Sequence, residues 1–228
     1  MAAEPDRVYP STPPPALVAA QAVAHRVAAE IGPSIVPGVT ELELTDKINE
    51  LCNAYGSTGQ WTPVTTRVGL GTLVAHPDFP MQARAAALGD TAFVDVTPTI
   101  DGWLGDHCVS YVVGGDDDAE SPARRLLEDC RWVQEQMIEA ARPGMPANEL
   151  FAVGVELLRQ RGLKLLDLLD NFGHSIGPTF ASDGFIDADN STRMFGAWTI
   201  EPQVGRRAMG AKYEDVVWLA SDGTKTVI

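Results

Sequence analysis

The chain has 228 residues, 45% of them hydrophobic, and a formal net charge of −14. Its length suffices for one large domain with a sizeable core, and its negative charge disfavours nucleic acids and anionic membranes as partners. The sequence contains no run of about 20 apolar residues, so a membrane-spanning helix is not expected. The three cysteines form no CxxC motif; a disulfide scaffold is therefore not expected, and a reducing, cytoplasmic location is the simplest interpretation.

The first residues combine prolines with acidic residues, where a signal peptide needs a basic start and an apolar stretch. We therefore expect residues 1–15 to form an extended arm and residues 16–228 to form a single domain. The alanine-rich segment after the arm predicts a helix, on which His25 would be an ordinary helix residue. The chain is expected to be a monomer or a homodimer, in which the arm could take part.

A repeat with an offset of 106 residues follows. PGVTELELTDKINELCNAYG begins at residue 37, and PGMPANELFAVGVELLRQRG begins at residue 143. Each copy predicts a Pro-Gly break, a helix closed by glycine, and then strands. In the first copy Thr40 and Glu43 fit a capping box. The pattern predicts two related halves that share one core.

Each half also carries a pair of carboxylates in a strand-like segment. Asp95 and Asp106 lie in AFVDVTPTIDGWLGDHCVSYVVG, and Glu201 and Glu214 lie in WTIEPQVGRRAMGAKYEDVVWLA. Asp95 and Glu201 are again 106 residues apart. We therefore expect the carboxylates to meet where the two halves meet.

Local turn chemistry predicts how these strands pair. Asp101-Gly102 is a strong two-residue hairpin signal, which would place Cys108 opposite Asp95. Asp106 would then be a diagonal neighbour of Asp95, roughly 7–8 Å away. In the second segment a loop centred near residue 207 would place the two glutamates opposite each other.

Like charges that face each other across a buried sheet need compensation, because burying a carboxylate is costly unless it is paired or bound to metal. Few lysines or arginines lie within these strands, so we expect metal rather than ion pairs. Two divalent ions would balance four carboxylates, and His174 in GHSIG would add a neutral ligand. The alternative, a sheet with a solvated acidic face, is disfavoured by the repeat and by His174.

These segments, together with FGHSIG and AKYEDVVWLASDG, resemble in order and spacing the signatures of the methionine aminopeptidase/creatinase metallopeptidase superfamily. The pattern is most similar to bacterial methionine aminopeptidases, and an additional N-terminal domain like that of Xaa-Pro peptidases is not expected. The resemblance covers residues 15–228. It implies an α/β (α+β) pita-bread fold: two pseudo-twofold-related halves with a curved, mainly antiparallel sheet covered by helices.

The resemblance also implies a site for two divalent ions of manganese, cobalt, iron or zinc. Asp95 would bind one ion, Asp106 and Glu214 would bridge both, and His174 and Glu201 would complete the other. A hydroxide that bridges the ions would attack a carbonyl, with Glu201 passing the proton to the leaving amine.

One substrate contact follows from the same resemblance. His76, in LVAHPDFP, falls where the family places a catalytic histidine that contacts the substrate. Apart from the resemblance, the aromatic residues Trp61, Phe180 and Trp198 are expected to line the substrate pocket; the alternative is a place in the core, where buried aromatic residues are common.

The chain departs from the family pattern at one position. Ala181 stands where these peptidases usually carry a second histidine, seven residues after the ligand histidine. Loss of one such donor costs about 10²–10³ in rate. His107 is expected to point to the opposite face of its strand and not to replace it. The connection from Glu201 to Glu214 is also shorter than in methionine aminopeptidases.

Three functions are therefore considered. The first is a dimetal-dependent hydrolase that removes an N-terminal residue from peptides. The second is a non-peptidase metalloenzyme of the same fold that acts on a small amide or a specialised metabolite. The third is a non-catalytic peptide-binding module, which the presence of all five metal ligands disfavours.

Overall fold

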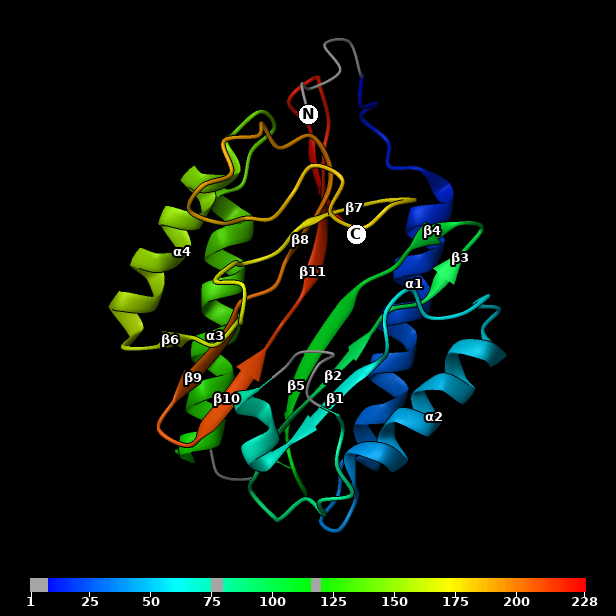
Figure 1. Cartoon of the computed structure of the whole chain (residues 1–228), viewed down its shortest axis with the longest axis vertical. Coiled ribbons are helices and arrows are strands. Elements are labelled where there is room, and N and C mark those ends of the chain that lie inside the picture. The colour runs from blue at the N-terminus through cyan, green and yellow to red at the C-terminus, as the bar shows by residue number, and fades with distance from the viewer. Residues whose placement is uncertain (1–7, 75–79, 116–119) are drawn as a thin grey trace.

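The computed structural model describes residues 8–74, 80–115 and 120–228. Four long helices flank the strands: α1 (Pro15–Ile31), α2 (Glu41–Ala54), α3 (Pro122–Ala140) and α4 (Ala147–Arg161), with short 3-10 helices at Gly32–Ser34 and Gly69–Leu73. Figure 1 shows α1 and α2 on one side of the strands and α3 and α4 on the other. Each side thus holds one helix that precedes a copy of the repeat and one helix within that copy, which agrees with two related halves.

The strands form antiparallel sheets. They are β1 (Thr65–Val68), β2 (Thr91–Val96), β3 (Thr99–Ile100), β4 (Trp103–Leu104), β5 (His107–Val112), β6 (Lys164–Leu165), β7 (Ser175–Ile176), β8 (Gly196–Ile200), β9 (Gln203–Arg206), β10 (Met209–Lys212), β11 (Asp215–Leu219) and β12 (Lys225–Val227). Their orders are β1-β2-β5, β10-β9-β6, β12-β11-β8-β7 and β3-β4, with every pairing among them antiparallel. The predicted mixed fold with a mainly antiparallel sheet is confirmed.

Both predicted strand registers are confirmed. In the first half Ile100 pairs with Trp103 across the Asp-Gly turn, and Asp95 pairs with Cys108. In the second half β8 and β11 pair Ile200 with Asp215. Glu201 and Glu214 are the next residues in that register, just beyond the ends of the two strands.

The two halves are joined where β5 runs beside residues 212–214. The backbone N–H of Glu214 donates to the Cys108 carbonyl over 2.9 Å, and the Cys108 N–H donates to the Glu214 carbonyl over 3.3 Å. The Ser110 hydroxyl donates to the Lys212 carbonyl over 2.8 Å. These bonds bring the acidic segments of both halves into contact.

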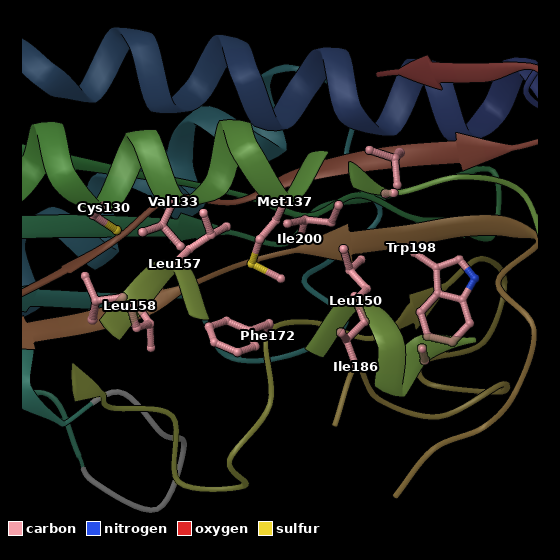
Figure 2. Packing of buried hydrophobic residues seen from close by; sticks show 14 of the residues in the cluster. Cys130, Val133, Met137, Leu150, Leu157, Leu158, Phe172, Ile186, Trp198 and Ile200 are labelled. Atoms are coloured by element: carbon pink, nitrogen blue, oxygen red, sulfur yellow. The ribbon is translucent and has the colours of Figure 1, made fainter. Parts of the chain in front are cut away.

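The larger core cluster lies in the second half, between α3, α4 and β8. Figure 2 shows Phe172 among side chains that include Met137, Leu150 and Ile186. Trp198 belongs to this core and is fully buried. The expectation that Trp198 lines a substrate pocket is therefore wrong, because its ring is packed within the hydrophobic interior.

Two local predictions at the N-terminal end can be compared with the structure. The capping box is confirmed: Glu43 N–H donates to the Thr40 hydroxyl, and Thr40 N–H donates to the Glu43 carboxylate. The arm runs against β11, where the Trp218 indole N–H donates to the Pro10 carbonyl over 2.7 Å. The first helix begins at Pro15, one residue before the expected boundary. None of the helices in the described ranges is long and apolar enough to span a bilayer.

Candidate metal centre

His174 is positioned by its backbone against β8. Its N–H donates to the Thr199 hydroxyl over 3.0 Å, and its carbonyl accepts from the Thr199 N–H over 2.8 Å. The preceding residue, Gly173, has φ +142°, and a Cβ there would overlap the Thr199 carbonyl oxygen. Only glycine allows this close approach without strain. The contact of Gly173 with β8 therefore sets the backbone position of His174.

The His174 ring offers one nitrogen to the site. Its Nδ1–H donates to the Ser175 carbonyl, 3.1 Å away, which leaves Nε2 with its lone pair. Nε2 lies 3.5 Å from Asp106 Oδ2 and 3.4 Å from Glu201 Oε1. Two ligands of one octahedral ion, each about 2.1 Å from it, lie about 3 Å apart, so this spacing suits shared coordination.

Asp106, His174 and Glu214 form the centre of the cluster. One candidate ligand atom of each lies within 4.8 Å of the others, and the three residues are 2%, 5% and 0% exposed. Gln21 of α1 holds Asp106 in place, because its amide donates to the Asp106 carbonyl and accepts from the Asp106 N–H. The candidate ligands thus come from segments of both halves, and a helix of the first half supports one of them.

Lys212, at the end of β10, enters the same cluster. Its Nζ lies 2.7 Å from Asp95 Oδ2, 2.7 Å from Glu201 Oε2 and 3.1 Å from Glu214 Oε2. The expectation that basic residues do not pair with these acids was therefore wrong. Lys212 precedes Glu214 by two residues, so strand alternation places both side chains on one face.

Burial and charge shift the proton affinities of this cluster. Burial, followed by the charges of neighbouring carboxylates, raises the pKa values of Asp106 and Glu214 well above their usual range. Burial would lower the pKa of Lys212, but the surrounding carboxylates outweigh it and raise that pKa, which keeps the ammonium charged. Burial would likewise raise the pKa of Glu201, but the Lys212 charge contributes to a net lowering.

The donor atoms of this cluster fit a divalent ion. Asp95 Oδ1 and Glu214 Oε1 are buried and have no hydrogen-bond donor among the described residues, whereas Glu214 Oε2 lies 3.1 Å from the Lys212 ammonium. Buried carboxylate oxygens without donors are costly, and a cation removes that cost. Carboxylate oxygens with one imidazole nitrogen suit manganese, iron, cobalt or zinc.

The aromatic residues Trp61 and Phe180 lie beside the candidate metal cluster. Their rings stack with centroids 5.0 Å apart, and the Phe180 ring meets the His174 ring edge-on at 4.5 Å. The Trp61 indole N–H donates to the Gly105 carbonyl over 2.8 Å, one residue before Asp106. Phe180 is 43% exposed, so this aromatic pair forms a partly exposed apolar surface next to His174.

Three further positions singled out in the sequence do not add to the cluster of candidate ligands among the described residues: Ala181, His76 and His107. Ala181 adopts φ +48°, and its N–H donates to the Ser175 carbonyl over 2.8 Å; its methyl group supplies no donor. His76 lies outside the described residues. His107 points away from the metal ligands, as predicted, and its Nδ1 donates to the Glu214 carbonyl over 2.7 Å.

A second cluster lies on this other face: His25, His107 and Asp215. His107 Nδ1 is 3.1 Å and His25 Nε2 is 3.5 Å from Asp215 Oδ1. Burial would raise the pKa of Asp215, but hydrogen bonds with both histidines help to lower it. No sequence signal connects His25 with this region, because α1 and β11 meet only through the tertiary fold.

A mixed α/β fold of two related halves, with acids and one histidine converging between them, defines a metallopeptidase of the pita-bread class. The model of metallopeptidase family M24 matches residues 16–221, and the chain belongs to this family. The predicted superfamily is therefore confirmed.

Particular relatives include both dipeptidases and aminopeptidases. The chain is 30% identical over 218 residues to the probable dipeptidase PepE of Mycobacterium tuberculosis, covering 93% of this chain and 56% of that protein. It is 25% identical over 201 residues to methionine aminopeptidase A of Synechocystis, covering 83% and 77%. The chain thus spans little more than half the length of PepE.

Solved structures have the same fold. Dipeptidase PepE from Mycobacterium ulcerans superposes with a TM-score of 0.80 at 26% identity, over 93% of this chain and 56% of that one. Methionine aminopeptidase from Thermotoga maritima gives a TM-score of 0.78 at 18% identity, over 96% and 98%. At that identity the second comparison speaks for the fold alone.

Proposed function

We propose that this chain is a metal-dependent hydrolase that removes an N-terminal residue from peptides. The observation that carries the proposal is the buried convergence of Asp106, His174 and Glu214, with unsatisfied carboxylate oxygens, beside the reachable aromatic pair. Membership of a metallopeptidase family supports it, as do relatives named for dipeptidase and aminopeptidase activity. The three cysteines are free, which supports a cytoplasmic location.

The five predicted ligands would hold the metal, and enzymes of this family depend on two ions. Asp106 and Glu214 would be shared ligands, His174 and Glu201 would complete one position, and Asp95 would serve the other. A divalent ion bound there polarises a carbonyl and lowers the pKa of water. Which metal serves is set by availability as much as by these ligands.

Glu201 is proposed as the residue that moves the proton. Its Oε1 accepts a hydrogen bond from the Thr199 hydroxyl over 3.3 Å, and it faces His174 Nε2. From this position Glu201 would take the proton of the attacking water and deliver it to the departing amine. His76 is proposed to contact the substrate carbonyl.

Trp61 and Phe180 are proposed to receive the first side chain of the substrate. Their stacked rings adjoin the His174 imidazole, so a side chain packed on them would bring its own carbonyl next to the metal ligands. The cluster of carboxylates at the same place favours a positively charged free amine over a blocked one. This arrangement would select a free N-terminus.

A second candidate is hydrolysis of a small amide or a specialised metabolite by the same site. The specific observation that favours it is Ala181, where no imidazole is present to stabilise a developing oxyanion. One missing donor of this kind costs about 10²–10³ in rate. A small substrate that places fewer demands on that position would be affected less.

The test is amino-acid release from a panel of free-N-terminus peptides, including Met-Ala and Xaa-Pro, with Mn²⁺ or Co²⁺ supplied. Asp106→Asn serves as the control, because it removes a shared ligand and changes almost no volume. Release that disappears in this variant supports the aminopeptidase, and the panel gives its preference. No release from metal-loaded wild-type protein would contradict the proposal and direct the search to small amides.

A further inference from the structure

We propose that the Lys212 ammonium takes the place of one of the two metal ions, so that the site holds a single divalent ion between Asp106, His174 and Glu214. This inference rests on the proposed function only in using the same ligands. It makes the centre mononuclear, with a resident cation supplied by the chain.

The contacts of Lys212 identify which position it takes. Asp95 is the ligand assigned to the position that His174 does not serve, and its Oδ2 lies 2.7 Å from the Lys212 Nζ. The three N–H donors of an ammonium match the three carboxylates around it: Asp95, Glu201 and Glu214. The ammonium therefore lies among the acids that the second ion would need.

Glu201 and Glu214 each contact Lys212 through one carboxylate oxygen and leave the other oxygen free of it. Glu201 directs Oε2 to the ammonium at 2.7 Å, while its Oε1 lies 3.4 Å from His174 Nε2. Glu214 lies 3.1 Å from the ammonium through Oε2, and its Oε1 is buried without a hydrogen-bond donor. Each glutamate thus keeps one oxygen for an ion beside His174, which is the arrangement of a bridge between one metal and one ammonium.

Lys212 is held in this place by its backbone. Its N–H donates to the Ser110 hydroxyl over 2.9 Å, and the same hydroxyl donates to its carbonyl over 2.8 Å. The side chain is only 10% exposed. If a second ion displaced the ammonium, this buried charge would lose three carboxylate partners, and leaving a buried charge unpaired is strongly unfavourable.

A second divalent ion would also lie close to the ammonium. At a separation of about 4 Å, the repulsion between a dication and an ammonium amounts to several kcal/mol even at an effective dielectric of 20.

The test counts metal ions. Protein stripped with chelator is titrated with Mn²⁺, bound manganese is measured by elemental analysis, and electron paramagnetic resonance distinguishes an isolated ion from a spin-coupled pair. We expect wild-type protein to bind one Mn²⁺ at the centre with the spectrum of an isolated ion. We expect Lys212→Met, of similar length and without charge, to bind two with a coupled spectrum.

Control variants isolate the role of the ammonium. The comparison of the wild-type protein with Lys212→Met is repeated in a His25→Ala background. There, metal bound by the second cluster of His25, His107 and Asp215 does not enter the count. Lys212→Arg keeps the charge and should remain at one ion. Should Lys212→Met fold poorly, Lys212→Gln replaces it, and a coupled pair in the wild-type protein would overturn the inference without any variant.

A coupled pair in the wild-type protein would overturn the inference, and so would a folded Lys212→Met protein that still binds one ion. Peptide release is measured separately on the same samples. One ion without release refutes the proposed function and leaves the Lys212 assignment standing. Two coupled ions with release do the opposite.

Discussion

The placement of His174 depends on a neighbour that has no side chain. Gly173 combines a positive φ of +142° with direct contact between its backbone and β8. We expect Gly173→Ala to lower the free energy of unfolding by about 1–3 kcal/mol through overpacking, and to weaken Mn²⁺ binding at least tenfold because His174 must shift. Chemical unfolding with chelator present and a Mn²⁺ titration measure the two effects.

Gly162→Ala is the matched control for this prediction. Gly162 also has a positive φ, +62°, but a Cβ there would meet nothing within 4 Å. It should therefore lose about 1–2 kcal/mol of stability from backbone strain and bind Mn²⁺ normally. Equal metal affinities in both variants would show that the contact at Gly173 does not position the ligand.

Phe180 allows a direct test of the aromatic surface. Its ring is 43% exposed and stacks on Trp61, so Phe180→Ala should cost little stability. Aromatic pairs contribute about 0.5–1.5 kcal/mol beyond their buried area, and a loss of 1.4 kcal/mol is tenfold in affinity. We therefore expect KM for a hydrolysed peptide to rise about tenfold, with kcat changed less.

Val155→Ala provides the comparison, because Val155 is 46% exposed on α4 and belongs to no predicted site. Its KM should equal that of the wild type. If Phe180→Ala lowered kcat while leaving KM unchanged, the ring would act on the chemistry and not on substrate binding.

Lys212 shows what residue-level reading can miss. The spacing of the four acids and His174 predicts that they cluster, whereas the small number of basic residues in these strands gives no sign of Lys212. Its separation of two from Glu214 was a usable signal, since residues two apart in a strand share a face. The contact with Asp95, in contrast, joins strands of different halves and follows only from the tertiary structure.

At the scale of elements, α4 is fitted closely to the core at Gly154. A Cβ there would lie 2.7 Å from the Phe172 ring, which Figure 2 shows among the side chains of the core. Alanine improves helix propensity by about 1 kcal/mol, but forcing a methyl group into a packed core costs about 1–3 kcal/mol. The two effects oppose each other, and the packing effect is the larger.

Gly154→Ala should therefore lower the free energy of unfolding by about 1 kcal/mol, measured by urea denaturation of the metal-free protein. Val155→Ala, on the next residue but facing solvent, should stay within about 0.5 kcal/mol of the wild type. A Gly154→Ala protein more stable than the wild type would mean that Phe172 can move aside and that helix propensity decides.

Strand registers were predictable where local chemistry sets them. The Asp-Gly turn fixes the pairing of Asp95 with Cys108, because a two-residue hairpin allows one register. The register of the second half was predictable for a related reason. Between β8 and β11 the chain forms a hairpin of β9 and β10, with Arg206 paired to Met209, and this hairpin keeps the same register as the outer pairing of β8 with β11. The burial of Trp198 and the meeting of α1 with β11 depend on packing between elements, which spacing along the chain does not reveal.

For the whole molecule, the proposed metal centre lies at the junction between the two halves. Asp106 comes from the first half and is held by Gln21, whereas His174 and Glu214 come from the second. An ion that binds all three links segments that unfolding would separate. Metal should therefore stabilise the entire fold and not one half of it, because a ligand that binds only the native state shifts the global equilibrium.

Removal of the metal should consequently lower Tm in one cooperative transition. At a free Mn²⁺ concentration of 100 times Kd the stabilisation is about 2.7 kcal/mol, and each kcal/mol shifts Tm by roughly 2–4 °C at this chain length. Calorimetry with Mn²⁺ and then with chelator should thus show a drop of roughly 5–10 °C. Asp106→Asn should show almost none, since the shared ligand is lost. Two separate transitions, only one of them sensitive to Mn²⁺, would mean that the halves unfold independently and that the ion belongs to one of them.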